Sequence, residues 1–335
     1  MISYLIRRFF YAFVSFFLLS LVVWVVIQLP PGDYVTSYVT ALRESGEFVD
    51  IETAIAMRNY YGLDQSMVTQ YFKWITRFVQ GDLGLSFGST HMQEQPVLTL
   101  LKSVVPWTVL MSLISVVVVY LVAIPAGIWA ATHQYRTSDY VIAMFGFVGM
   151  ATPNFMLALL LMFLLFRYFD VSAGGLFSVG QSLAPWSLEK VWDLIQHLWV
   201  PVVVTATAGT AALIRQMRAV MLDELGRQYV MTARAKGVGE VKMLFKYPVR
   251  VAMNPIVSSI GFIFPGLFSG AVVTAIVLNL PMTGAVLMRA LMKQDMFLAG
   301  SIIMIEASLV IVGVALSDIL LVLLDPRIRM ERPAQ

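Results

Sequence analysis

The chain contains no cysteine, so it can form no disulfide framework and offers no thiolate for zinc binding or nucleophilic catalysis. Charged residues are also scarce, at 13% of the 335 residues, whereas a typical soluble domain carries about 25%. The sequence lacks the phosphate-loop pattern G-x-x-x-x-G-K-[S/T] and the patterns H-E-x-x-H and G-x-S-x-G. We therefore expect this chain neither to hydrolyse ATP by itself nor to hold a metal or a catalytic site.

Apolar residues make up 59% of the chain, and they occur in long blocks rather than at helical or strand spacing. A helix needs roughly 20 apolar residues to cross a bilayer. Six runs are long enough: Phe9–Gly32, Ser103–Tyr135, Tyr140–Phe166, Leu194–Ile214, Val251–Met288 and Met296–Ser317. The fifth run exceeds one span, which predicts a re-entrant or interfacial extension near Leu280 and Pro281. The sequence thus predicts an all-α, polytopic integral membrane protein with six transmembrane helices.

The distribution of basic residues predicts the orientation, because Lys and Arg beside transmembrane helices favour the cytoplasmic side. Six spans put both termini on one side. If that side is cytoplasmic, the inner segments hold 14 basic residues and 6 acids, and the outer segments hold 9 basic residues and 12 acids. The opposite orientation would reverse this bias, so we expect both termini in the cytoplasm. The first run exceeds the apolar core of a signal peptide, so we expect it to remain as a span.

These spans suggest three parts: an N-terminal transmembrane helix over residues 1–32, an extracytoplasmic insert over 33–102, and a core with five transmembrane helices over 103–335. Apolar residues recur at helical spacing in the insert. They are Val68, Tyr71, Phe72, Ile75, Phe78 and Val79. This spacing predicts a helix that lies on the membrane surface or packs on the spans and that ends at Gly81–Gly84. The insert is either a structural cap on the outer face or a contact for an extracytoplasmic partner.

The segment Leu213–Pro255 is polar and basic, with eight Lys or Arg residues against three acids. A basic loop of this length between two spans is expected in the cytoplasm, where it serves membrane topology rather than nucleic-acid binding. Within it, Ala233–Gly237 reads ARAKG, a run of helix formers followed by glycine, which predicts a helix that stops and turns. We expect the loop at about 215–250 to dock a partner.

Glu306 is the deeply placed ionisable residue of the last run. An acid near the bilayer centre costs a few kcal/mol unless it is protonated, paired or facing water. It either lines an aqueous translocation path or makes a hydrogen bond between helices. A proton relay would need further ionisable groups along the spans, so the sequence does not favour a proton-driven transporter.

Short motifs along nearly the whole chain resemble those of one family. The motifs are Tyr4-Leu5-Ile6-Arg7-Arg8, Pro31-Gly32-Asp33, Tyr61-Gly62-Leu63-Asp64, Gln70-Tyr71, Gly81-Asp82-Leu83-Gly84-Leu85-Ser86, Ile124-Pro125-Ala126-Gly127, Pro153-Asn154-Phe155, Arg218 with Tyr229 to Gly237, and Asp325-Pro326-Arg327-Ile328-Arg329. In this order and spacing the chain resembles the membrane permease subunit of bacterial ABC importers of the oligopeptide/dipeptide type, specifically the first of the two paired permeases. The resemblance implies the type I importer permease fold and a multi-pass location in the bacterial inner membrane.

The resemblance also implies that the basic loop forms a short coupling helix that sits in a groove of an ATPase subunit. The matching residues are Asp223, Tyr229, Ala233, Arg234, Ala235, Lys236 and Gly237. Small residues would allow close docking, and Arg234 and Lys236 would meet acids on the partner. The implied partners are a homologous second permease, two ATP-binding subunits that carry ATP and Mg, and an extracytoplasmic substrate-binding protein. No cofactor is expected in this chain, and no nucleic acid.

The last third departs from the peptide-type pattern. Ala275 stands where an acid is usual, Pro281-Met282-Thr283-Gly284 replaces a Pro-Gly-x-Gly turn, and Glu306 occupies a position that is usually apolar. These changes leave open whether the cargo is an oligopeptide or an oligosaccharide. The expected function is half of the path of an ATP-driven importer, and the competing interpretation is a secondary transporter or channel that works without ATP.

Overall fold

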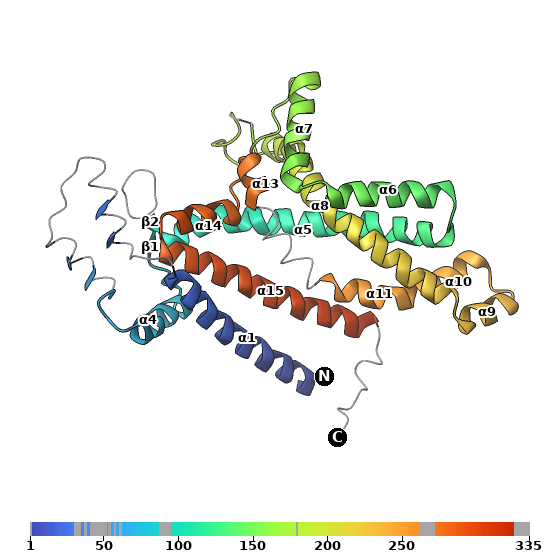
Figure 1. Cartoon of the computed structure of the whole chain (residues 1–335), viewed down its shortest axis with the longest axis horizontal. Coiled ribbons are helices and arrows are strands. Elements are labelled where there is room, and N and C mark those ends of the chain that lie inside the picture. Colours follow the sequence, from blue (N-terminus) through green and yellow to red (C-terminus); the bar gives the residue numbers. More distant parts are fainter. Residues whose placement is uncertain are drawn as a thin grey trace. The chain divides into compact units, whose positions relative to one another are not determined.

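The computed structural model of the chain describes residues 2–29, 35–36, 39–40, 52, 55–56, 58–59, 62–86, 95–178, 180–260 and 272–324 (Figure 1). In chain order the elements are α1 (Ile2–Gln28), α4 (Met67–Val79), β1 (Leu85–Ser86), β2 (Gln95–Pro96), α5 (Val97–Thr132), α6 (Thr137–Ala151), α7 (Asn154–Phe169), α8 (Leu188–Leu225), α9 (Gln228–Ala235), α10 (Glu240–Lys246), α11 (Pro248–Ser258), α13 (Val272–Val277), α14 (Thr283–Met292) and α15 (Met296–Leu324). The predicted all-α class is confirmed. The motif Pro31–Asp33, the expected boundary after residue 32 and the tail motif from Asp325 lie outside the described residues.

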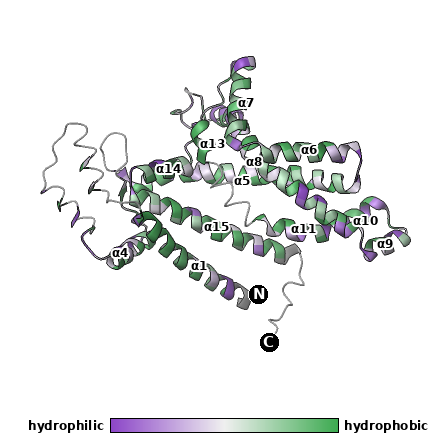
Figure 2. Ribbon diagram, in the orientation of Figure 1, coloured by the Kyte–Doolittle hydropathy of each residue, from purple (hydrophilic) through white to green (hydrophobic). Residues whose placement is uncertain are grey.

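Four single helices of the described residues are long and apolar enough to cross a membrane: Ile6–Gln28, Val97–Thr132, Leu188–Leu225 and Met296–Leu321. Hydrophobic residues follow α1 and α15 along most of their length, whereas hydrophilic residues gather around α9 and α10 (Figure 2). Three of these helices begin earlier than their apolar runs. For example, α5 starts at Val97 and includes Lys102, because helical hydrogen bonding continues past the edge of an apolar stretch.

The expected span Tyr140–Phe166 is a bent pair, in which α6 and α7 meet at an angle of 102°. The break falls at Thr152 and Pro153, where Thr152 is extended and Pro153 precedes the first residue of α7. A proline disfavours the helical conformation of the residue before it, which explains why the helix stops there.

The long run Val251–Met288 is also divided. Its described part forms α11, α13 and α14, and the chain leaves the helical conformation between α13 and α14, with Asn279 at a φ of 50°. The chain is therefore not helical at Leu280 and Pro281, and the re-entrant or interfacial extension expected there stays a prediction. Residues 261–271 of this run lie outside the described residues, so the count of six spans stays a prediction from sequence.

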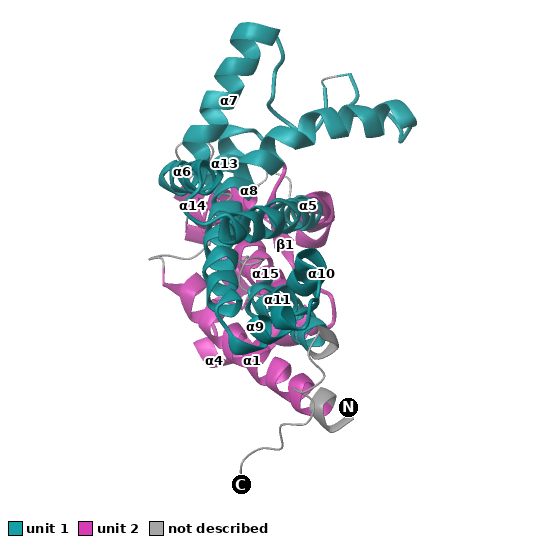
Figure 3. Ribbon diagram, turned by 90° about the vertical axis from the view of Figure 1, so that its right-hand side faces the viewer, with its two compact units in different colours: residues 1, 108–280, 312–335 teal, residues 2–107, 281–311 magenta. Residues whose placement is uncertain are grey.

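The chain divides into two compact units (Figure 3). Unit 1 contains residues 108–280 and 312–335 together with Met1, and unit 2 contains residues 2–107 and 281–311. The units group the segments differently from the three parts expected from the sequence, because the insert shares unit 2 with α1, α14 and the first half of α15.

In unit 2, the helix predicted in the insert is α4, and it packs on α1. Tyr71 and Trp74 of α4 are buried, the ring of Trp74 lies 5.5 Å from that of Trp24, and the hydroxyl of Tyr71 shares a 2.8 Å hydrogen bond with Ser20. An amphipathic helix has one apolar face to bury, and here α1 covers part of it. Gly81 and Gly84 both adopt positive φ after α4, as expected for the turn that ends it.

In unit 1, α8 contacts α6, α7 and α11, and its buried side chains join those of α5 and α11 in one hydrophobic core. The helices α5 and α8 approach closely at Gly127, where an added Cβ would lie 2.6 Å from Cβ of Met217. Buried hydroxyls add polar links: Ser115 and Thr205 share a 2.8 Å hydrogen bond, and Ser317 of α15 donates to the carbonyl of Val257 at 2.8 Å. Small residues and interhelical hydrogen bonds of this kind are typical of packed membrane helices.

Candidate functional site

The basic loop expected to dock a partner folds as a helical hairpin in unit 1. The span helix α8 ends at Leu225, the two short helices α9 and α10 follow, and α11 begins at Pro248 (Figure 1). We call residues Gln228–Lys246 the coupling hairpin. Because α8 and α11 enter and leave it directly, both ends of the hairpin are joined to helices of the unit 1 core.

The helix α9 ends as the ARAKG pattern predicts. Its last residue is Ala235, and Gly237 takes a φ of 75°, in the left-handed region. The amides of Gly237 and Val238 then donate to the carbonyls of Arg234 and Ala233, at 2.9 and 3.2 Å. A Cβ at Gly237 would meet nothing within 4 Å, so the glycine is required by its backbone conformation rather than by crowding.

The hairpin has a small hydrophobic core of its own. Val230 and Met243 are fully buried and Ala233 is 6% exposed, and Val238 and Tyr247 pack against them. Ala233 is thus buried between α9 and α10 in this structure. These side chains come from α9, from α10, from the turn between them and from the residue before α11. The two helices of the hairpin therefore pack against each other around a shared core.

Two polar contacts hold the hairpin in place. Arg234 donates to both carboxylate oxygens of Glu240, at 2.9 Å from Nε and 3.3 Å from Nη2, which ties α9 to α10. Tyr229 donates a hydrogen bond to Glu224, the penultimate residue of α8. Partial burial of Tyr229 and the adjacent carboxylate of Glu224 raise the pKa of this phenol above its usual value, so it stays a neutral donor.

Of the residues expected to couple to an ATPase, six are exposed on the hairpin and its approach. They are Asp223, Tyr229, Arg234, Ala235, Lys236 and Gly237. Lys236 has no acidic partner among the residues that the structure describes. Sequence reasoning did not find Glu224, Glu240 or Met243. The apolar spacing of Val230 and Ala233 on one face of α9 is the signal that could have indicated the internal core.

Glu306, the other residue singled out by sequence, lies on α15 in unit 2 and is partly buried. Its Oε1 accepts a 2.7 Å hydrogen bond from the hydroxyl of Thr283, the first residue of α14. Glu306 thus makes a hydrogen bond between two helices, as one of its two interpretations from sequence predicts. A role in a translocation path stays a prediction.

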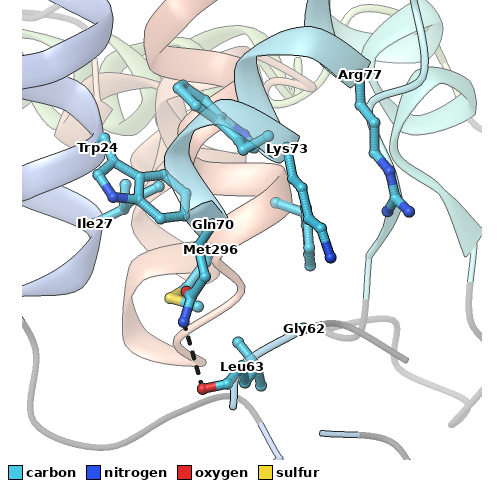
Figure 4. A pocket seen from close by; sticks show the side chains of 10 residues that line it. Trp24, Ile27, Gly62, Leu63, Gln70, Lys73, Arg77 and Met296 are labelled. Carbon is cyan, nitrogen blue, oxygen red and sulfur yellow. Dashed lines mark hydrogen bonds between the residues drawn. The ribbon is translucent and has the colours of Figure 1, made fainter. Parts of the chain in front are cut away.

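The insert between the first two apolar runs, which we expect on the outer side, carries a second, smaller site candidate in unit 2. The side chains of Gln70, Lys73 and Arg77 extend from one side of α4 toward a pocket of about 50 Å³, and Gln70 donates to the carbonyl of Leu63 at 3.4 Å (Figure 4). Among the described residues, neither Lys73 nor Arg77 has an acidic partner. The pocket is too small to hold a peptide, so Lys73 and Arg77 at its edge are more relevant as a basic surface than as the lining of a binding pocket.

Among the described residues, four helices are long and apolar enough to cross a membrane, and a short helical hairpin follows one of them, α8, which is an architecture compatible with a membrane transport subunit. Two family models match this chain: "Binding-protein-dependent transport system inner membrane component" over residues 123–330, and its N-terminal counterpart, "Binding-prot-dependent transport system membrane comp, N-term", over residues 1–114. The chain belongs to this family of binding-protein-dependent transport permeases, and the resemblance to peptide-type ABC permeases is confirmed.

The similarity to individual relatives extends over most or nearly all of the chain. The oligopeptide transport system permease protein AppB of Bacillus subtilis is 32% identical over 331 residues, which cover 98% of this chain and 99% of that protein. The glutathione transport system permease protein GsiC of Escherichia coli O6:H1 is 29% identical, with the same coverage of both chains. The ABC transporter permease protein YejB of Escherichia coli O157:H7 is 32% identical over 85% of this chain and 78% of its own length.

Proposed function

We propose that this chain is one of two permease subunits of an ATP-driven importer and forms half of the path for an oligopeptide. An extracytoplasmic binding protein delivers the peptide, and a second, homologous permease completes the path. The observation that carries this proposal is the 32% identity to an oligopeptide permease over 98% of the chain. The oligopeptide and glutathione systems among the relatives support a peptide cargo over an oligosaccharide.

We further propose that the coupling hairpin docks on one of two ATPase subunits, which bind ATP and Mg. Exposed charges support this contact, because Lys236 on the hairpin and Asp223 near the end of α8 lack ion-pair partners among the described residues. The hairpin is packed as one body, so a push on α9 reaches α8 through Tyr229 and Glu224 and reaches α11 through Tyr247. ATP binding would then bias a two-state opening of the spans from a distant site.

The expected orientation, with both termini and the hairpin in the cytoplasm of the inner membrane, is part of the proposal. The positive-inside distribution of Lys and Arg supports it. Since the natural chain has no cysteine, single-cysteine variants are clean probes. Thr232→Cys on α9 should react with a membrane-impermeant maleimide only after the inner membrane is opened, and Thr76→Cys on α4 should react in intact spheroplasts. The reverse pattern would contradict the orientation.

Transport itself is tested in vesicles that contain this chain, its second permease and its ATPases, with the binding protein outside. We expect accumulation of a labelled oligopeptide that requires both ATP and the binding protein. Omission of the ATPases is the matched control and should abolish uptake. If vesicles that contain this chain alone accumulate solute against a gradient, the competing interpretation of an ATP-independent transporter is correct instead.

A further inference from the structure

A cavity of about 400 Å³ opens between α6 and α8 in unit 1, apart from the coupling hairpin. It lies within the range of roughly 300–1,000 Å³ that ligand pockets occupy. One part of it is apolar, lined by Ile142, Ala143, Gly146, Phe147, Met150, Ala211 and Ile214. The other part is polar, lined by Tyr135, Asp139, Tyr140, Arg215 and Arg218. We call this cavity the α6–α8 groove.

The polar part of the groove carries a net positive charge. Asp139 is almost fully buried and accepts hydrogen bonds from Nε and Nη2 of Arg218, at 2.7 and 2.8 Å, so these two charges neutralise each other. The carboxylate also accepts a 3.1 Å bond from the amide of Tyr135. Arg215 is exposed and has no acidic partner among the described residues, which leaves its charge for a ligand.

Small residues open the apolar part of the groove. A Cβ added at Gly146 would meet nothing within 4 Å, and Ala143 and Ala211 face the same space from α6 and α8. Phe147 is 64% exposed and adds apolar surface at its edge. A hydrocarbon chain is the kind of ligand that fills such a surface without polar partners.

From the apolar runs of the sequence we expect the two parts at different depths of the membrane. Arg215 follows the apolar run Leu194–Ile214 directly, so it marks a membrane surface, where Tyr135 and Tyr140 are also favoured. Gly146 and Ala211 lie one or more turns further into the apolar stretches of α6 and α8. A ligand must therefore present an anion at the surface and an apolar chain toward the bilayer interior.

We propose that the α6–α8 groove binds an anionic phospholipid, with the phosphate of its headgroup on Arg215 and one acyl chain along Gly146 and Phe147. A basic pocket between transmembrane helices is a typical setting for a lipid headgroup. The long side chain of Arg215 can extend to the headgroup while its stem covers apolar surface. The proposal needs no assumption about which membrane face carries Arg215.

The test is native mass spectrometry of the purified full-length chain in detergent with equal amounts of dioleoylphosphatidylglycerol and dioleoylphosphatidylcholine. We expect the chain to retain about fivefold more phosphatidylglycerol than phosphatidylcholine. This factor corresponds to the attraction of one basic residue for an anionic headgroup, about 1 kcal/mol. Arg215→Gln should abolish this preference. Arg250→Gln removes an exposed basic residue of α11 outside the groove and should leave the preference unchanged.

A second variant tests the acyl chain. Gly146→Trp fills the apolar part and should lower the retention of both lipids, whereas inorganic phosphate at millimolar concentration should displace neither. Displacement by phosphate would point to a soluble anion as the ligand and would overturn the proposal. Equal retention of the two lipids, or an unchanged preference in Arg215→Gln, would also overturn it. So would loss of the lipid when the second permease assembles, because the groove would then be a subunit interface.

Discussion

The hydroxyl of Ser86 donates a 2.6 Å hydrogen bond to Oδ2 of Asp295, although 209 positions separate the two residues. Both side chains are buried within unit 2. The other oxygen of Asp295 accepts a 3.0 Å bond from the amide of Leu298 and thereby caps the start of α15. One carboxylate thus joins strand β1 of the insert to the beginning of a span.

Replacement of this carboxylate should destabilise unit 2. Asp295→Ala removes the helix cap and leaves the buried Ser86 hydroxyl without this acceptor, and we expect a loss of roughly 2–4 kcal/mol in the free energy of unfolding. Asp82→Ala is the matched control, since Asp82 is exposed and its Oδ1 accepts a 3.1 Å hydrogen bond from the nearby amide of Gly84. Thermal unfolding of the purified chain in detergent measures both. An equal effect of the two variants would show that the Ser86–Asp295 bond contributes nothing.

The ion pair between Asp139 and Arg218 should stabilise unit 1 in a similar way. Arg218→Gln leaves a carboxylate that is only 4% exposed without its cation, and removal of one partner of such a pair costs roughly 3–5 kcal/mol. Arg215→Gln, three residues earlier on α8, removes an exposed charge that has no acidic partner in the described part of the chain, and it should change the stability by less than about 0.5 kcal/mol. The melting temperatures of the two variants provide the comparison, and similar values would contradict a stabilising role of the pair.

A charge swap separates the two roles open to Arg234. The Arg234–Glu240 bond is at the surface, with side chains 49% and 67% exposed, so its own contribution to stability should be below about 1 kcal/mol. Arg234→Glu should reduce ATP-dependent uptake, since it places two like charges together. If the pair acts within the hairpin, the double variant Arg234→Glu, Glu240→Arg should restore uptake. If the double variant stays inactive with normal membrane levels, Arg234 acts on an acid of the ATPase instead.

The left-handed conformation of Gly237 predicts a graded response to substitution. Asn tolerates this conformation, so Gly237→Asn should retain most of the uptake activity. Gly237→Val should cost roughly 1–2 kcal/mol in local stability and uncouple uptake from ATP hydrolysis, because a β-branched residue resists positive φ. Rates of ATP hydrolysis and uptake in the same vesicles measure the coupling. Equal activity of the two variants would rule out a backbone requirement at this position.

We expect that Glu306 serves as the acceptor of the hydrogen bond from Thr283, and that its charge is not needed for transport. Glu306→Gln keeps an acceptor at the same place. The melting temperature should therefore stay close to that of the natural chain, and the uptake rate should stay within about twofold. Thr283→Val removes the donor and should cost about 1 kcal/mol in stability. If Glu306→Gln unfolds normally but transports poorly, the charge itself is required, and the interpretation of Glu306 as a path residue gains support.

Local sequence signals predicted local structure well. The spacing of Tyr71 and Phe78 indicated α4, and the glycine at 237 indicated the end of α9. Both features arise from interactions within a few residues, namely one apolar face on a helix and one backbone conformation that favours glycine. The family was also accessible from sequence, since its motifs extend along nearly the whole chain.

Long-range pairs were not accessible in this way. No periodic pattern indicates that Ser86 bonds Asp295, or that Thr283 bonds Glu306, because a polar residue has no partner preference until packing brings one within reach. The role of Ala233 shows the same limit. Its small size suggested close docking on a partner, whereas in the structure it is buried against Met243 inside the hairpin.

The long apolar runs alone indicated a bundle of membrane helices with one basic loop, because the length of a span is fixed by the thickness of the bilayer. Three features became known only from the packed helices: which buried polar groups meet, how far α6 and α7 bend at Pro153, and that Arg215 lies beside an apolar groove without an acidic partner among the described residues. These features depend on contacts between residues far apart in the chain, and such contacts exist only once the helices have packed.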